Sequence, residues 1–302
     1  MGGRDASSDA AGLERLAARG RPLVQLYVSP ACARLAGRIE LSAGTRGVTR
    51  AEIREGGYEA KARLPLLPWR APNADEMAKL VSAAPPVDLS GAVCLVRPPG
   101  AFAQQRRSVL RKSQGADADA LTWLGRVCSL GEPLGCIGAT SNAANLTTVT
   151  FDHAAGGHYI GLHVDNWDGL DLEVRRRSTN RICVNIGEDD RYILFLPITL
   201  ETMGEMLAEA FGEAWTPAGR FTLIGREFMT LHPDTPVVRC RIAPGEAYIA
   251  PTENLVHDAS SEGQRTLDEQ FTVRGHIGLR RSPSLGLRAV WGALRGLGGR
   301  ER

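Results

Sequence analysis

Residues 180–200, NRICVNIGEDDRYILFLPITL, contain two β-rich runs on either side of an acidic turn. Branched and aromatic side chains dominate both runs, and GEDD between them has the composition of a solvated hairpin turn. Similar runs occur at close spacing from about residue 145 onward, namely NLTTVTFD, GHYIGLHVD, TPVVRCRI, EAYIA and QFTVRGHIG. Many short strands separated by turns predict a β-sandwich or barrel rather than a parallel sheet with crossover helices.

The first half of the chain predicts a mixed region in which helices dominate. PLVQLYV is expected to form a strand, and NADEMAKLVSAA a helix after its asparagine cap. Helix is also expected from AFAQQRRSVLRKSQ through ADALTWLGRVCSLG down to Gly131. The expected division is a loose leader at 1–20, a mixed, helix-rich flanking region at 21–145, a β core at 146–280 with a helical insertion at 201–215, and a basic tail at 281–302.

The composition of the 302-residue chain is that of an ordinary globular protein, 43% apolar and 23% charged. Its formal net charge is +2 and the basic residues are spread along the whole length, so a nucleic-acid partner is not expected. Six cysteines without a CxxC pair suit a reduced compartment. The sequence shows no signal-peptide centre and no window of about 18–20 apolar residues, so we expect a cytoplasmic protein without a membrane partner. Nothing in the sequence indicates an oligomeric state.

The run GLHVDNWDGL at 161–170 places a histidine and an aspartate two residues apart in a predicted strand. Side chains alternate along a strand, so one face is expected to be apolar and the other to carry polar groups. The apolar face would hold Ile160, Leu162 and Val164, and the polar face Tyr159, Gly161, His163 and Asp165. This pair is therefore a candidate for two ligands of a metal ion.

A second HxD pair, His232 and Asp234 in LHPDTP, is not expected to be functional. Its central proline cannot donate to a sheet and its neighbours favour a turn. His257 in APTENLVHDAS, after the turn and strand PGEAYIA, is the candidate third ligand. Two imidazoles and one carboxylate leave coordination positions open, as in non-haem Fe(II) enzymes, whereas a structural zinc site closes with four ligands that usually include thiolates. No cysteine lies near His163 or His257 in the sequence, which favours the open site.

An HxD pair on one strand, a Pro-Gly turn leading to a distal histidine, and a basic residue on the following strand resemble the Fe(II)- and 2-oxoglutarate-dependent oxygenases. The resemblance covers roughly residues 145–280. It implies an α+β fold built on a double-stranded β-helix, the cupin-like jelly-roll barrel, with flanking helices mostly from the N-terminal half. It also implies His163, Asp165 and His257 as iron ligands, with Fe(II), 2-oxoglutarate and O2 as cofactor and cosubstrates.

The resemblance further implies a cation that binds the distal carboxylate of 2-oxoglutarate, for which the fork of an arginine is well suited. Arg265 and Arg274 are the two candidates, and Arg274 is favoured because the alternation in QFTVRGHIG directs it away from the apolar face. Tyr159 and Asn185 could bond a cosubstrate carboxylate, or could simply fill the core and the sheet. Trp167 could line the substrate mouth or cover the rim of the barrel.

The implied activity is that of an oxidoreductase, a dioxygenase that oxidises an unactivated C–H bond and releases succinate and CO2. Hydroxylation is the expected form of this oxidation. The substrate is expected to be a small molecule, such as an amino acid or a natural-product intermediate. Asp165 favours hydroxylation over halogenation, because halogenating members of the family have a small residue at that position. Desaturation, ring closure and epimerisation stay open, as do two other classes, a cupin-fold metal-dependent hydrolase or isomerase and a non-catalytic cupin-like binding protein.

Overall fold

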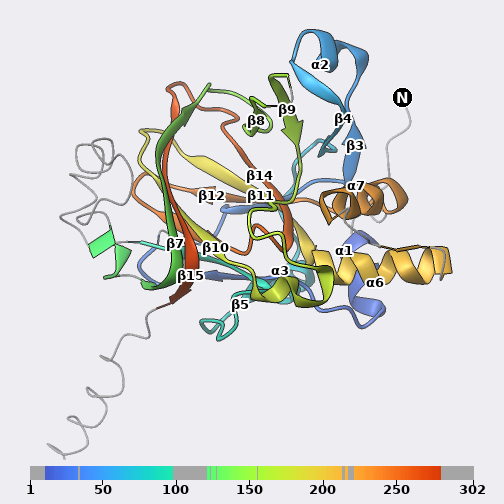
Figure 1. Cartoon of the computed structure of the whole chain (residues 1–302), viewed down its shortest axis with the longest axis horizontal. Helices are drawn as coiled ribbons and strands as arrows, with labels where there is room; N and C mark the ends of the chain where they lie inside the picture. The colour runs from blue at the N-terminus through green and yellow to red at the C-terminus, as the bar shows by residue number, and fades with distance from the viewer. Residues whose placement is uncertain are drawn as a thin grey trace, which may run out of the picture.

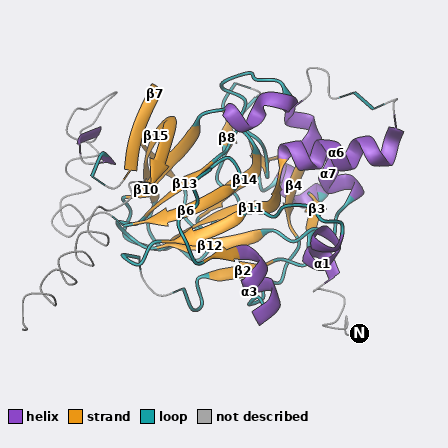
Figure 2. Ribbon diagram, turned by 90° about the horizontal axis from the view of Figure 1, so that it is seen from below, coloured by secondary structure: helices purple, strands orange, loops and turns teal. Residues whose placement is uncertain are grey.

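The structure, a computed structural model, consists of two facing β-sheets, a third small sheet and a few helices (Figure 1, Figure 2). It describes residues 11–32, 35–97, 121–122, 124–126, 128–154, 156–212, 215–216 and 221–279. The helix expected at 101–114 and the basic tail expected at 281–302 lie outside these residues. In the described part of the chain, no helix is both long and apolar enough to cross a membrane.

The larger sheet has seven strands, in the order β5-β1-β6-β13-β10-β15-β7. Pairing is parallel among the first three strands and antiparallel from β6 to β7. The bounds are β5 Val81–Ser82, β1 Gln25–Val28, β6 Ala92–Val96, β13 Ala247–Ala250, β10 Asn180–Asn185, β15 Asp268–Leu279 and β7 Cys128–Asn142. Strands from before and after residue 145 therefore belong to one sheet.

The smaller, antiparallel sheet has the order β14-β11-β12-β2 and packs its inner face against the larger sheet. Its strands are β14 Leu255–Ser260, β11 Arg191–Thr199, β12 Val238–Ile242 and β2 Ile39–Leu41. The core between the sheets contains apolar side chains from both, among them Leu26, Cys183, Phe195, Val238 and Tyr248. The expected α+β class is confirmed, and the described part of the chain is rich in sheet with few helices.

Two helices, α6 (Leu200–Phe211) and α7 (Phe221–Leu231), cover the outer face of the smaller sheet and lie beside each other in both views (Figure 1, Figure 2). They form the connection between β11 and β12, and the Thr199 hydroxyl caps α6 by accepting from the Thr202 amide. The expected helical insertion corresponds to α6. Helix α7, whose sequence FTLIGREFMTL is rich in β-branched and aromatic residues, was not predicted.

A third sheet, ordered β3-β4-β9-β8, brings the first half of the chain next to the HxD segment. Its strands are β3 Thr45–Gly47, β4 Tyr58–Pro65, β9 His158–Gly161 and β8 Phe151–Asp152. Strand β9 ends at Gly161, whose φ is +70° and where an added Cβ would lie 2.5 Å from the Arg63 carbonyl oxygen. Only glycine fits this position, and the chain leaves the third sheet there.

The prediction that helices dominate the first half is wrong for the part that the structure describes. The helices there are short, α1 (Ala11–Ala18), α2 (Arg50–Arg54) and α3 (Ala74–Leu80), and they alternate with strands β1 to β6. The expected loose leader contains α1, because Leu13 and Leu16 are buried in the core. Residues 121–122 and 124 are also helical, within the helix that was expected to reach Gly131, but β7 begins at Cys128 because it pairs with β15.

Gly225 permits α7 to lie directly on the strands that carry the candidate ligands. A Cβ at this position would lie 2.4 Å from Cγ2 of Val256 and 3.5 Å from Cγ2 of Val164. We expect Gly225→Ala to lower the free energy of unfolding by about 1–3 kcal/mol, as overpacking does elsewhere. Chemical denaturation of wild type and variant measures the change. Gly47→Ala is the control, because a Cβ there meets nothing within 4 Å, and a change within about 0.5 kcal/mol is expected.

Candidate metal centre

The candidate metal centre lies where the segment after β9 runs beside β14. His163 and His257 form an isolated antiparallel bridge, in which each amide donates to the other carbonyl, at 3.0 Å and 2.8 Å. Residues that exchange both hydrogen bonds lie directly opposite each other, with their side chains on the same face. The two imidazole centroids are accordingly 4.7 Å apart.

Asp165 completes a group of three possible metal ligands. One ligand atom from each of His163, Asp165 and His257 lies within 4.8 Å of the others. Nε2 of His163 is 3.7 Å from Oδ1 of Asp165, and Nε2 of His257 is 3.9 Å from Oδ2. The three side chains that were expected to converge are therefore together, and they could hold a metal ion.

The hydrogen bonds of the two imidazoles leave their Nε2 atoms available as ligands. Nδ1 of His163 is 2.9 Å from the Gly161 carbonyl oxygen, and Nδ1 of His257 is 3.0 Å from that of Leu255. A carbonyl oxygen can only accept, so each Nδ1 carries the proton and donates. Each Nε2 then keeps its lone pair on the side of Asp165. Fixing the tautomer through the other ring nitrogen is the usual way in which metal-binding histidines are oriented.

The charges of the group suit a divalent cation. Burial lowers the pKa of His257 to about 3, so this imidazole is neutral at physiological pH. Burial acts in the opposite direction on Asp165, but Arg181 and then the two imidazoles outweigh it and bring the pKa of this carboxyl to about 2. Nη2 of Arg181 donates to Oδ2 of Asp165 at 2.6 Å. An ionised carboxylate thus lies beside a neutral imidazole, a donor set that first-row divalent metals accept.

The buried carboxyl group of Asp258 lies on the Nδ1 side of His163. Oδ2 of Asp258 has no hydrogen-bond partner and lies 3.8 Å from Nδ1 of His163. Oδ1 of the same residue accepts from the Thr150 hydroxyl at 2.8 Å and the Ala259 amide at 2.7 Å. Burial raises the pKa of Asp258. Asp258 therefore lies near His163 without a hydrogen bond to it, and the Nδ1 proton of His163 goes to the Gly161 carbonyl.

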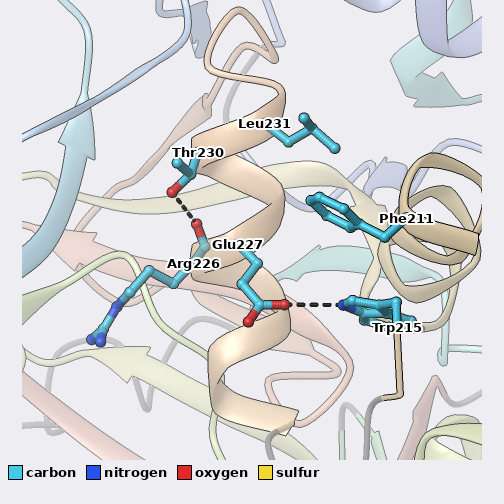
Figure 3. Close-up of a pocket in the computed structure, with 6 residues that line it drawn as sticks. All are labelled: Phe211, Trp215, Arg226, Glu227, Thr230 and Leu231. Carbon is cyan, nitrogen blue, oxygen red and sulfur yellow. Dashed lines mark hydrogen bonds between the residues drawn. The ribbon is translucent and has the colours of Figure 1, made fainter.

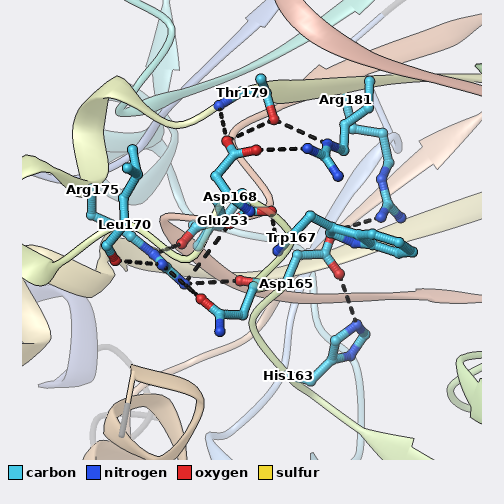
Figure 4. A network of polar contacts seen from close by, with 12 residues as sticks. His163, Asp165, Trp167, Asp168, Leu170, Arg175, Thr179, Arg181 and Glu253 are labelled. Carbon is cyan, nitrogen blue, oxygen red and sulfur yellow. Dashed lines mark hydrogen bonds and ion pairs between the residues drawn. The ribbon is translucent and has the colours of Figure 1, made fainter. Parts of the chain in front are cut away.

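The loop after Asp165 is held by a fully buried arginine (Figure 4). Arg175, in the short helix η1 (Leu172–Arg177), donates five hydrogen bonds at 2.7–3.0 Å, to the carbonyls of Asp165, Leu170 and Glu253 and twice to Asn166 Oδ1. The Glu253 carboxylate accepts in turn from the backbone amides of the loop, 2.7 Å for Trp167. The position of Asp165 is therefore fixed on both sides.

The two arginines considered for a cosubstrate carboxylate lie in different surroundings. Arg274, on β15, donates from Nη2 to Asp168 at 2.6 Å and from Nε to the Thr179 hydroxyl at 3.0 Å. Its guanidinium carbon lies 5.4 Å from the ring centroid of Trp167, which is 63% exposed. Arg265 is exposed in the turn before β15, where its amide donates to Asp189.

Two lesser candidates lie away from the ligands. Tyr159 packs in the third sheet against Tyr58 and Phe151, because the turn at Gly161 interrupts the alternation that was expected to place it beside His163. The Asn185 amide group donates to the carbonyls of Asp189 and Ile242, and its oxygen accepts from Gly187. The second HxD pair, His232 and Asp234, lies in the turn after α7, where Asp234 forms an ion pair with Arg15.

Two hollows lie near α7. A cavity of about 190 Å³ is lined by His163, Leu162 and Val164 on one side and by α7 on the other. A surface hollow of about 610 Å³ lies between α6 and α7, and none of the three candidate ligands lines it (Figure 3). Its walls are Phe211, Trp215, Arg226, Glu227, Thr230 and Leu231.

Comparison with known proteins gives only a distant likeness. No family model matches the chain, and no curated protein does. Among solved structures, it is similar to the crystal structure of the Kdo hydroxylase KdoO, a non-heme Fe(II) alphaketoglutarate dependent dioxygenase, in complex with cobalt(II). The identity is 13% and the TM-score 0.29, over 62% of this chain and 81% of that one. A likeness at this level does not establish a shared fold, so the function rests on the geometry described above.

The sequence analysis missed three charged residues of the centre. Arg181 has the same parity as Asn185 in NRICVNIG, so the alternation that selected Asn185 also indicated Arg181. Arg175 and Glu253 lie in segments without a regular pattern, and no local signal marks them. Their importance follows only from the hydrogen bonds of the folded chain.

Removing Arg175 should loosen the loop that carries Asp165. Arg175→Met would leave Glu253 and three backbone carbonyls without their buried donor, and breaking such an arrangement costs about 3–5 kcal/mol. We expect this loss in the free energy of unfolding, measured in urea. Arg177→Met, an exposed arginine of the same helix, should change it by no more than about 0.5 kcal/mol. Equal effects of the two substitutions would contradict the role of Arg175.

Proposed function

We propose that the protein is a non-haem Fe(II)- and 2-oxoglutarate-dependent dioxygenase that oxidises a C–H bond of a small molecule. Hydroxylation is the expected form of this oxidation. The observation that carries this proposal is the convergence of His163, Asp165 and His257 within 4.8 Å, with the Nδ1 of each imidazole hydrogen-bonded to a backbone carbonyl. Two imidazoles and one carboxylate are the ligand set of oxygen-activating Fe(II) enzymes. With no thiolate among these three ligands, the set differs from that of most structural zinc sites.

The arrangement of strands supports a double-stranded β-helix. Strands β7, β15, β10 and β13 are consecutive neighbours in the larger sheet, and β14, β11 and β12 in the smaller one. The His163 bridge extends the smaller sheet beside β14. Along the chain, β12 to β15 alternate between the two sheets, as the strands of a jelly roll do. Both ligand-bearing segments then lie side by side in the same layer.

The protein's own groups would have the following roles. Nε2 of His163, Nε2 of His257 and a carboxylate oxygen of Asp165 would hold the iron, which when bound supplies the oxidative chemistry that side chains lack. His257 is buried, and His163 and Asp165 are half-buried, so only a small part of the three side chains is open to water. Arg175 and Glu253 keep the loop that bears Asp165 in place. Trp167, exposed beside the centre, would line the substrate mouth.

Arg274 would bind the distal carboxylate of 2-oxoglutarate. Its Nε and Nη2 are used by Thr179 and Asp168, but Nη1 has no partner among the residues that the structure describes. A guanidinium has five donors and can bind a second carboxylate without losing the first. Tyr159 and Asn185 remain candidates for the same cosubstrate only if they leave the contacts described above.

Succinate release in the presence of a panel of small molecules would identify the substrate class.

The iron centre is tested by spectroscopy without oxygen. Purified protein with Fe(II) and 2-oxoglutarate should show the visible charge-transfer band of an iron-bound 2-oxo acid. His163→Ala should abolish the band because one of three ligands is lost, whereas His232→Ala should keep it. Iron binding without the band, and without succinate under air, would assign the protein to another class of metal-dependent or binding proteins.

The choice between the two arginines is tested by affinity for 2-oxoglutarate. Arg274→Gln should raise the dissociation constant by about 10–100-fold, which corresponds to about 1.4–2.8 kcal/mol. Arg265→Gln should leave it within about twofold, a difference below about 0.5 kcal/mol, because this side chain is exposed in a turn. Titration of the charge-transfer band gives both constants. A larger effect at position 265 would reverse the assignment.

A further inference from the structure

Arg181 is the interior arginine whose partner is a proposed metal ligand. Several buried or half-buried arginines have a carboxylate partner, among them Arg274 with Asp168, Arg191 with Asp268, and Arg181 with Asp165. A cation bound by Asp165 would neutralise part of the carboxylate charge that now balances Arg181. The other two pairs would be unaffected, because neither Asp168 nor Asp268 belongs to the group of three.

The hydrogen bonds of Arg181 are incomplete. Its Nη2 donates to Asp165 (Figure 4), whereas its Nε is buried and has no partner. The side chain is 18% exposed, so most of the guanidinium is withdrawn from water. A buried charged donor without an acceptor is costly unless a ligand or a water completes it. Arg175 differs from Arg181 in this respect, because its side chain donates five hydrogen bonds.

The sheet adds to the positive charge near Arg181. Arg181 on β10 and Arg274 on β15 are direct cross-strand neighbours. Like charges in such positions repel each other, and here each is balanced by one aspartate. With a divalent cation at Asp165, the charges of the cation, Arg181 and Asp165 sum to about +2, which favours an anion at the metal.

We propose that Arg181 couples metal loading to anion binding: it holds Asp165 before the metal binds, and then binds the carboxylate of a 2-oxo acid at the metal. This inference rests on the metal centre of the proposed function. It assigns to Arg181, on β10, a task separate from that of Arg274, because Arg181 acts on the carboxylate next to the metal and Arg274 on the distal one. The coupling free energy between two binding sites is reciprocal, so the metal and the anion must each raise the affinity for the other by the same factor.

Metal affinity measured with and without pyruvate tests this coupling. Pyruvate is a 2-oxo acid without a distal carboxylate, so Arg274 has nothing to bind. Co(II) serves as the metal, and its dissociation constant is obtained by competition with a chromophoric chelator. In wild type, saturating pyruvate should tighten Co(II) binding by about tenfold or more, within the usual range of coupling between sites. Arg265→Gln, which removes an exposed arginine in the turn before β15, is the control and should leave both the affinity for Co(II) and the coupling unchanged.

Arg181→Gln should reverse the pattern. Without its competing cation, Asp165 should bind Co(II) alone as tightly as in wild type or more tightly, while the effect of pyruvate should shrink by about tenfold. If this variant does not fold, as judged by circular dichroism, Arg181→Lys replaces it. A lysine keeps the charge but offers no fork, so the coupling should again be reduced.

The outcomes separate this inference from the proposed function. If Co(II) binds wild type and His163→Ala equally, the metal centre itself is wrong. If Co(II) requires His163 but pyruvate tightens it equally in wild type and in the Arg181 variants, the metal centre stands and the role of Arg181 is refuted. A weaker affinity of Arg181→Gln for Co(II) alone, with unchanged coupling, would also refute it, because Arg181 would then only position Asp165.

Discussion

The pair of backbone hydrogen bonds between His163 and His257 is the constraint on which the centre depends. It joins the HxD segment to β14 and fixes which side chains face each other. Two features maintain it. The turn at Gly161 directs the chain from the third sheet toward β14, and Val164 and Val256, each next to a ligand, pack under α7. A shift of one residue would turn one imidazole to the opposite face.

Paired charges determine what can happen inside the two sheets. Burying a charge without a partner is expensive, and the buried or half-buried arginines Arg38, Arg175, Arg181, Arg191 and Arg274 each lie beside a carboxylate. In the same interior, His257 avoids the cost by staying neutral. The interior is therefore close to electrically balanced before any ligand binds. A cation at the three ligands would disturb the pair of Arg181 and Asp165, and the response of that pair connects the metal to the anions around it.

Much of the β core could be predicted because its signals are local. Alternation and branched residues indicated β10, β11, β12, β13 and β15, and the spacing of His163 and Asp165 indicated two of the three side chains that converge. The failures have long-range causes. Tyr159 was placed on the ligand face because Gly161 was taken to continue the strand. Strand β6 was missed because its run AVCLV, buried on both faces, lacks alternation, and α7 because its stability comes from packing on β11 and β14.

Two buried arginines near Asp165 show how hydrogen bonding distinguishes a structural residue from one that awaits a ligand. Arg175 finds protein acceptors for its Nε and both Nη groups, so nothing is gained by moving it. Arg181, whose side chain is half-buried, has one acceptor, and that acceptor is a proposed metal ligand. The Nε atoms of Arg21 and Arg241 also have no acceptor among the described residues, so the feature that sets Arg181 apart is that its one acceptor is a carboxylate that the metal would also use.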